Sequence, residues 1–108
     1  MAKIETISLK GCSGKTYNFD VYHIGTDFKA LGAVYCISKR KDNNHTLIYL
    51  GITDDLSTRF NNHHKEDCFK NHNANCVSVH LNSSEKERKL IEQDLLCNYN
   101  FPCNEVNN

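Results

Sequence analysis

The stretch from residue 47 to residue 63 is the part of the sequence that most restricts the fold. Residues 47–52 form a short apolar run rich in β-branched and aromatic side chains, and such a run predicts a buried strand. Residues 53–55 then supply an N-cap and early negative charge, which favour the start of a helix. On that helix Arg59 and His63 lie four residues apart, so they would share a face. The sequence therefore predicts a strand that leads into a short helix carrying a cation and an imidazole.

Length and charge restrict the class of protein. A chain of 108 residues allows one domain with a modest core. The 13 basic and 13 acidic residues give a net charge of zero, so any binding of nucleic acid must rest on a local basic patch. No apolar run is long enough to span a membrane. The N-terminal residues alternate and carry charge, unlike a secretory leader, so we expect a cytoplasmic protein whose six cysteines are free thiols.

Residues 1–31 are expected to form an N-terminal β-hairpin extension. Residues 4–9 and 17–22 have strand-like patterns, and the segment from Gly11 to Gly14 supplies the turn. This turn lacks the spacing of a Walker phosphate-binding loop and no helix follows it. A plain hairpin turn is therefore the better interpretation.

Residues 32–108 are expected to form the main domain. Residues 33–38 and 47–52 predict two antiparallel strands joined by a long polar loop, and residues 76–81 predict a third strand. Ser84 and Glu87 fit a capping box at the start of a helix. The expected core face of that helix consists of apolar residues at helical spacing: Leu90, Ile91, Leu95 and Leu96. The expected fold class is α/β of the mixed α+β kind, with a small central antiparallel β-sheet flanked by helices.

Five residues could carry chemistry together: Tyr35, Tyr49, Arg59, His63 and Glu92. Each also has a purely structural interpretation. A strand tyrosine is usually half-buried packing, a helical arginine is usually solvated, and a glutamate beside an apolar helix face usually forms a salt bridge. Only their combination indicates a phosphate site.

The order of these residues resembles the GIY-YIG nuclease domain. Residues 33–35 (Ala-Val-Tyr) and 49–51 (Tyr-Leu-Gly) match its two short motifs, with Ala33 in place of a glycine and Leu50 in place of an isoleucine. The C-terminal part of the resemblance is the most specific, and it consists of Glu92, Leu95, Leu96, Tyr99, Pro102 and Asn104. The resemblance covers residues 32–104, about two thirds of the chain.

This resemblance implies a divalent-metal-dependent endonuclease that hydrolyses phosphodiester bonds, in DNA more readily than in RNA. Glu92 would hold Mg²⁺ or Mn²⁺, and Arg59 would clamp a phosphate oxygen through its planar fork of donors. Tyr35 would take a proton from the attacking water, and Tyr49 would position the water or the phosphate. His63 would relay a proton or contact phosphate.

Three further residues complete the expected site. His64 could take the place of His63 if the helix register differs. Gly51 would let a phosphate or another backbone come close, and Asn104 would tie the C-terminal segment near the site. Family members usually take sequence specificity from an attached DNA-binding domain, so here a partner protein could supply it.

Two other functions are alternatives. The first is a nucleic-acid-binding or regulatory module on the same fold that cuts poorly, which the zero net charge favours. The retention of Tyr35, Tyr49, Arg59 and Glu92 together favours the nuclease. An interaction protein acting through the N-terminal hairpin has no specific support.

A zinc site is a competing interpretation of the histidines and cysteines. Five such residues recur at intervals of four: His64, Cys68, His72, Cys76 and His80. On one continuous helix they would form a metal-binding stripe. Residues 76–81 alternate like a strand, however, and the intervening asparagines are poor helix formers. Coincidence is therefore the better interpretation.

Overall fold

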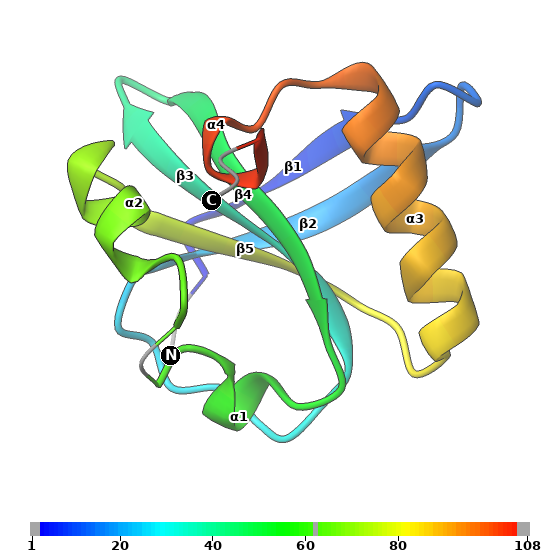
Figure 1. Cartoon of the computed structure of the whole chain (residues 1–108), viewed down its shortest axis with the longest axis horizontal. Coiled ribbons are helices and arrows are strands. Elements are labelled where there is room, and N and C mark those ends of the chain that lie inside the picture. The colour runs from blue at the N-terminus through cyan, green and yellow to red at the C-terminus, as the bar shows by residue number, and fades with distance from the viewer. Residues whose placement is uncertain (1–2, 62, 106–108) are drawn as a thin grey trace.

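A curled sheet forms the centre of the fold, and the helices lie around it (Figure 1). The computed structural model describes residues 3–61 and 63–105. In this part of the chain five antiparallel strands pair in the order β1-β2-β5-β3-β4. Their bounds are β1 Glu5–Lys10, β2 Thr16–His23, β3 Ala33–Lys41, β4 Asn44–Thr53 and β5 Cys76–Leu81. The mixed α+β class and the antiparallel sheet are thereby confirmed.

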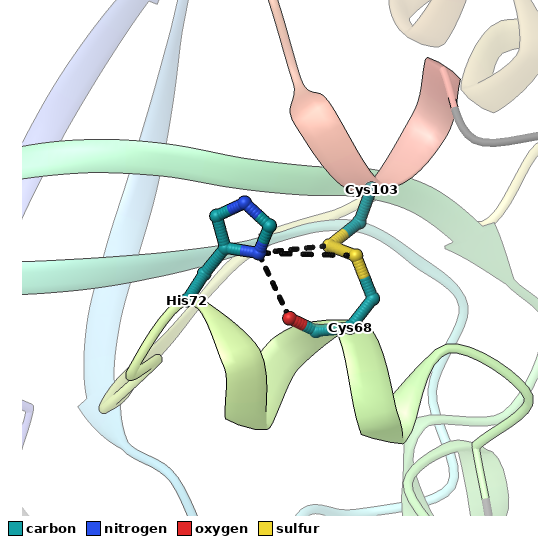
Figure 2. Close-up of side chains that lie close together, drawn as sticks. All are labelled: Cys68, His72 and Cys103. Atoms are coloured by element: carbon teal, nitrogen blue, oxygen red, sulfur yellow. Dashed lines mark hydrogen bonds between the residues drawn. A yellow bond between two sulfur atoms is a disulfide. The ribbon is translucent and has the colours of Figure 1, made fainter.

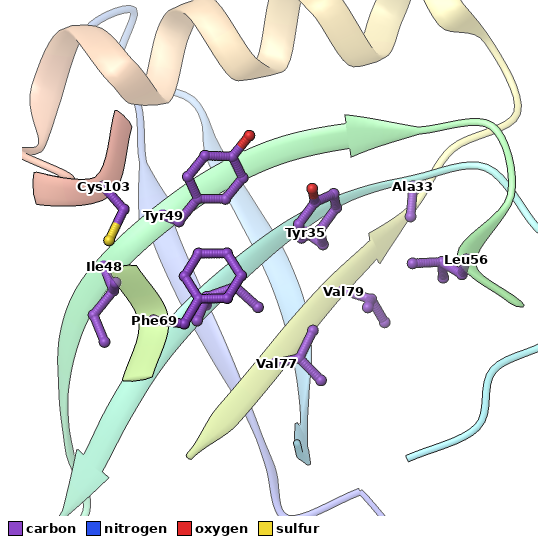
Figure 3. Packing of buried hydrophobic residues seen from close by; sticks show 10 residues of the cluster. Ala33, Tyr35, Ile48, Tyr49, Leu56, Phe69, Val77, Val79 and Cys103 are labelled. Atoms are coloured by element: carbon purple, nitrogen blue, oxygen red, sulfur yellow. The ribbon is translucent and has the colours of Figure 1, made fainter. Parts of the chain in front are cut away.

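Four helices cover the two faces of the curled sheet. They are α1 Leu56–Arg59, α2 Glu66–Asn71, α3 Glu85–Asn98 and α4 Pro102–Glu105. Figure 1 shows α1 and α2 on one side of the strands and α3 on the other. Because side chains alternate along a strand, β3 serves both layers. Tyr35 and Ile37 pack with Leu56 of α1 and Phe69 of α2, as Figure 3 shows for Tyr35. Val34 and Cys36, by contrast, belong to the same core cluster as Ile91 and Leu95 of α3.

The expected N-terminal hairpin is present as β1 and β2. Glu5 pairs with Val21, and Lys10 pairs with Thr16 at the turn. Strand β2 also pairs with β5, from Asp20 opposite Val79 to His23 opposite Cys76. The hairpin therefore continues the sheet of the main domain, with which it shares one hydrogen-bonded ladder.

The connection between β3 and β4 differs from the expected long loop. Lys41 pairs with Asn44, so only Asp42 and Asn43 form the turn. Both have positive φ angles, 54° and 67°. Two left-handed residues in sequence suit the twist of a tight hairpin, and Asp and Asn tolerate this conformation better than most residues. The polar composition of residues 39–46 therefore reflects solvent-exposed strand ends.

The helix starts follow the sequence. Asp55 caps α1, since its carboxylate accepts a hydrogen bond from the backbone of Ser57. Ser84 caps α3 in the same way through Glu87. Helix α1 is only four residues long, however, and ends at Arg59. The prediction that Arg59 and His63 share one helical face is therefore wrong, because His63 lies in the segment between α1 and α2.

The buried face of α3 also differs from the prediction. Its buried residues are Arg88, Ile91 and Leu95. Leu90 is 57% exposed and Leu96 is 37% exposed, so neither belongs to the core. The buried face of α3 therefore starts at the charged residue Arg88 and continues at spacings of three and four residues. The apolar pattern alone did not locate this face.

The prediction that all six cysteines are free thiols is wrong, because four of them form disulfides. Cys12 is bonded to Cys97, which joins the β1–β2 turn to the end of α3. Cys68 of α2 is bonded to Cys103 of α4. Disulfides are typical of oxidising compartments. The cytoplasmic location therefore stays a prediction, and the cysteines no longer support it. No helix in the described part of the chain has the length and apolar character needed to cross a membrane.

Candidate functional site

The hydroxyl of Tyr35 is the centre of a buried polar cluster. Its oxygen lies 2.7 Å from Nε2 of His63 and accepts a hydrogen bond from Nε of Arg59 at 2.9 Å. These three residues come from β3, from the end of α1 and from the segment before α2. The structure therefore brings Tyr35, Arg59 and His63 into direct contact, although the helix expected to present the last two is shorter.

The hydrogen-bond pattern fixes which nitrogen of His63 carries its proton. The backbone N–H of Lys65 donates to Nδ1 of His63 at 3.0 Å, so Nδ1 is the acceptor in a neutral ring. Nε2 then carries the proton and donates to Tyr35. Burial lowers the pKa of His63 to about 4, with smaller contributions from the charges of Arg59, His64 and Lys65. The ring is therefore neutral at physiological pH. Two N–H groups therefore donate to the same tyrosine oxygen.

Tyr49 lies beside Tyr35, with ring centroids 6.0 Å apart. Figure 3 shows the two side chains on one face of β3 and β4, with both hydroxyl oxygens turned to the same side. Burial raises the pKa of both tyrosines, and the charge of Arg59 opposes this rise in both. Interaction between the two hydroxyls then raises the pKa of Tyr35 and lowers that of Tyr49. Both tyrosine hydroxyls therefore keep their protons at neutral pH.

Gly51 makes this arrangement of tyrosines sterically feasible. It sits opposite Tyr35 in the β3–β4 register. A Cβ atom at this position would lie 2.7 Å from the Tyr35 hydroxyl oxygen and 2.9 Å from Cε2 of Tyr49. The space beside Gly51 is thus filled by two tyrosine side chains, whereas the sequence suggested a close approach of phosphate or backbone.

Glu92 approaches the cluster from α3. Its side chain is half-buried, and burial raises its pKa. The Glu92 charge also raises the pKa of Tyr49. This contribution is smaller than those of burial, the Arg59 charge and the hydrogen bond with Tyr35. Among the described residues, no hydrogen-bond donor or cation pairs with the Glu92 carboxylate. A half-buried carboxylate without a partner is a group that a cation would stabilise.

The two remaining site candidates have structural contacts. The amide of Asn104 accepts a hydrogen bond from the backbone N–H of Leu50 and donates one to its carbonyl, both at 2.8 Å. This ties the C-terminal segment to the strand residue next to Tyr49. His64 is exposed and stacks on His63, with ring centroids 4.6 Å apart. Its location is at the rim of the cluster.

No family model, curated protein or solved structure matches this chain. The resemblance to the GIY-YIG domain therefore rests on the residues named above and on their spacing.

A second group of side chains has the composition of a metal centre. Figure 2 shows Cys68, His72 and Cys103 close together, with Nδ1 of His72 3.9 Å and 3.8 Å from the two sulfur atoms. The sulfur atoms are bonded to each other, and Nδ1 donates to the Cys68 carbonyl at 2.9 Å. The two sulfur atoms are therefore not thiolates, and Nδ1 of His72 carries a proton, so only Nε2 of this ring keeps a lone pair that a metal could use. Cys76 and His80 lie on strand β5, which confirms the strand predicted there and rules out a continuous helical stripe.

Arg88 is a charged residue that the sequence did not single out. It occupies the buried face of α3, one turn before Glu92, and it lines a cavity together with Arg59. The spacing of Arg88 from Ile91 and Leu95 could have indicated its burial. This spacing places Arg88 on the same helix face, nearer to the start of α3.

Acidification should destabilise the protein through His63. Its folded-state pKa of about 4 lies below the usual 6.5, so the unfolded chain binds the proton first. The stabilising effect of the neutral ring is complete above pH 6.5 and is lost as the pH falls toward 4. Urea unfolding at pH about 7, 5.5 and 4.5 should show a shallower loss of stability for His63→Gln than for wild type. His23→Gln, which changes an exposed histidine, is the control. Equal slopes for wild type and His63→Gln would contradict the buried neutral ring.

Proposed function

We propose that this protein is a divalent-metal-dependent endonuclease that hydrolyses phosphodiester bonds of nucleic acid, with DNA as the preferred substrate. The observation that carries the proposal is the hydrogen-bonded cluster of Tyr35, Arg59 and His63 beside the unpartnered carboxylate of Glu92. Phosphoryl chemistry needs a cation on the phosphate, a proton acceptor for water and an anionic metal ligand. Arg59, the neighbouring Tyr49 and Glu92 would fill these three roles in turn.

Arg59 would bind the phosphate. Its Nε donates a hydrogen bond to the Tyr35 hydroxyl, and its guanidinium also interacts with the Tyr49 hydroxyl. Its guanidinium also lies over the Tyr35 ring, 5.8 Å from the centroid, which fixes its plane. A guanidinium held at one nitrogen can present its remaining donors to a phosphate oxygen with little loss of rotamer freedom. Charge that develops on the phosphate in the transition state would be stabilised there.

Tyr49 is the better candidate for the general base, with Tyr35 as the residue that supports it. Tyr35 is fully buried, whereas Tyr49 is 8% exposed and so lies nearer to water. The Arg59 charge and the Tyr35 hydroxyl both lower the Tyr49 pKa against the larger rise caused by burial. Tyr49 would take the proton of the attacking water after its own hydroxyl has lost a proton to solvent, an ionisation that the Arg59 charge favours. The donors on Tyr35 would hold the Tyr35 hydroxyl toward Tyr49. This assignment exchanges the roles that the family resemblance implied for the two tyrosines.

Glu92 suits a hard divalent cation. Mg²⁺ and Mn²⁺ prefer oxygen ligands, and a partly buried carboxylate with a raised pKa and no protein partner fits that need. A metal ion bound there would supply positive charge to the scissile phosphate. The protein contributes one carboxylate, so the substrate and solvent would complete the coordination.

The decisive experiment is a cleavage assay on supercoiled plasmid and on labelled single- and double-stranded oligonucleotides of DNA and RNA. Each substrate is incubated with Mg²⁺, with Mn²⁺ or with a chelator. Nicking that requires metal is the expected result. Binding of these substrates without cleavage under any of the metal conditions would instead establish the alternative, a nucleic-acid-binding module.

The two tyrosines are distinguished by a pair of conservative variants. Tyr49→Phe should lower kcat by about 10²–10⁴-fold, because it removes the general base. Tyr35→Phe should cause a smaller loss, on the order of tenfold, because Tyr49 keeps its hydroxyl and loses one interaction. Tyr22→Phe is the matched control, because Tyr22 is a partly buried tyrosine whose ring packs on Phe28. A larger loss in Tyr35→Phe than in Tyr49→Phe would return the base to Tyr35.

A further inference from the structure

Arg88 is a buried arginine without a counter-charge. Its side chain is only 5% exposed, although a guanidinium remains protonated in proteins. Its one hydrogen bond joins Nη1 to the carbonyl oxygen of Asn82 at 2.9 Å. Its Nε is buried and has no partner in the described part of the chain. Burying such a charge without an anion is unfavourable, so a structural role alone does not explain it.

The surroundings of Arg88 leave room for an anion. It lines a cavity of about 410 Å³ together with Arg59, Ile52, Thr53, Asp54 and Glu85. Gly32 leaves room for the Arg88 side chain, because a Cβ there would collide with Nη1 of Arg88. The cavity thus joins the proposed phosphate clamp to a second arginine through one continuous space.

The carboxylates of the cavity do not neutralise Arg88. Glu85 forms its ion pair with Lys89 at 3.7 Å, one turn along α3. Asp54 is exposed and forms no ion pair with either arginine among the described residues. The charge of Arg88 therefore remains available to a ligand.

We propose that Arg88 binds the phosphate next to the scissile one, so that Arg59 and Arg88 hold neighbouring phosphates of one nucleic-acid strand. This inference rests on the proposed function and names a second subsite of the same site. Arg88 precedes Glu92 by four residues, about 6 Å along the helix axis, so it lies one turn from the proposed metal ligand.

The test is a binding scan in the presence of a chelator, so that no cleavage occurs. Each phosphate of a short DNA oligonucleotide is replaced in turn by a neutral methylphosphonate. Wild type should lose affinity at two adjacent positions, by about ten- to a hundredfold at each. Arg88→Met should become insensitive at one position, and Arg59→Met at the other. Lys86→Met changes an exposed residue of α3 and should keep the wild-type pattern.

Thermal unfolding without nucleic acid separates this role from a structural one. Arg88→Met removes an uncompensated buried charge and retains most of the volume, so its Tm should equal or exceed that of wild type. A lower Tm combined with an unchanged methylphosphonate pattern would overturn the proposal. If Arg88→Met does not fold, Arg88→Lys replaces it, and this variant should bind the oligonucleotide more weakly with the same pair of sensitive positions.

The methylphosphonate scan tests the Arg88 subsite, and the cleavage assay tests the nuclease, so either proposal can be overturned without the other. A two-phosphate pattern that depends on both arginines, without metal-dependent cleavage, would support the Arg88 subsite and overturn the nuclease. Metal-dependent cleavage with an Arg88→Met pattern identical to wild type would support the nuclease and overturn the subsite.

Discussion

Replacement of Glu92 by glutamine should lower the rate of metal-dependent cleavage by on the order of 10³-fold or more. The amide keeps the shape of the side chain and removes the anionic ligand, and stabilisation of the transition state by a metal is worth several kcal/mol. The measurement is kcat for plasmid nicking at saturating Mg²⁺. Substrate affinity in a chelator should change little, because Arg59 is the proposed phosphate ligand.

The same substitution should not weaken the fold. Burial raises the pKa of Glu92, so the ionised carboxylate disfavours the folded state as the pH rises above the usual value of 4.5. Glu92→Gln removes that effect, and its Tm at neutral pH should equal or exceed that of wild type. Glu87→Gln changes an exposed carboxylate of α3 and is the control for both measurements. Undiminished cleavage by Glu92→Gln would show that the metal site lies elsewhere.

Loss of the Cys12–Cys97 disulfide should lower the free energy of unfolding by about 4–5 kcal/mol, by the chain-entropy account of cross-links. The bond joins residues 85 positions apart, so it restricts most of the unfolded chain. A small domain is stable by only about 5–15 kcal/mol, and this change would remove a large part of that. Urea unfolding of the double variant Cys12→Ala/Cys97→Ala provides the measurement.

Contacts around this disulfide should keep the double variant folded. Asp94 of α3 accepts hydrogen bonds from Ser13, through N–H and hydroxyl, and from the Tyr17 hydroxyl. The double variant Cys68→Ala/Cys103→Ala is the comparison, because its loop spans only 35 positions. Its expected loss is slightly smaller, about 4 kcal/mol. Unchanged unfolding of the Cys12 and Cys97 variant would show that the thiols are unpaired in the native protein.

The sequence predicted the strands and helix caps because their signals are local. The apolar runs in β3, β4 and β5, and the capping residues Asp55 and Ser84, act within a few positions of themselves. The end of α1 was not predictable in this way. His63 leaves the helix and still reaches Tyr35, because contacts across the sheet decide its position.

The errors in the core and at the cysteines have a common physical cause. A helix face is chosen by the total packing of its side chains, and here that packing buries Arg88 while Leu90 remains in solvent. A hydrophobicity pattern gives no signal for a buried charged side chain such as Arg88. Cysteine pairing similarly depends on which turns meet in space, and Cys12 and Cys97 come together only because the N-terminal hairpin packs against the end of α3.

The contact between Asn104 and Leu50 has a consequence for self-association. Strand β4 lies at the border of the sheet, where backbone groups without a neighbour are open to strand addition by another molecule. The Asn104 amide satisfies both backbone groups of Leu50, as one residue of an adjoining strand would. The C-terminal segment therefore occupies the position that a strand of another molecule would need in order to pair with β4 beside Tyr49. Through this contact Asn104 protects the edge of the sheet against edge-to-edge aggregation.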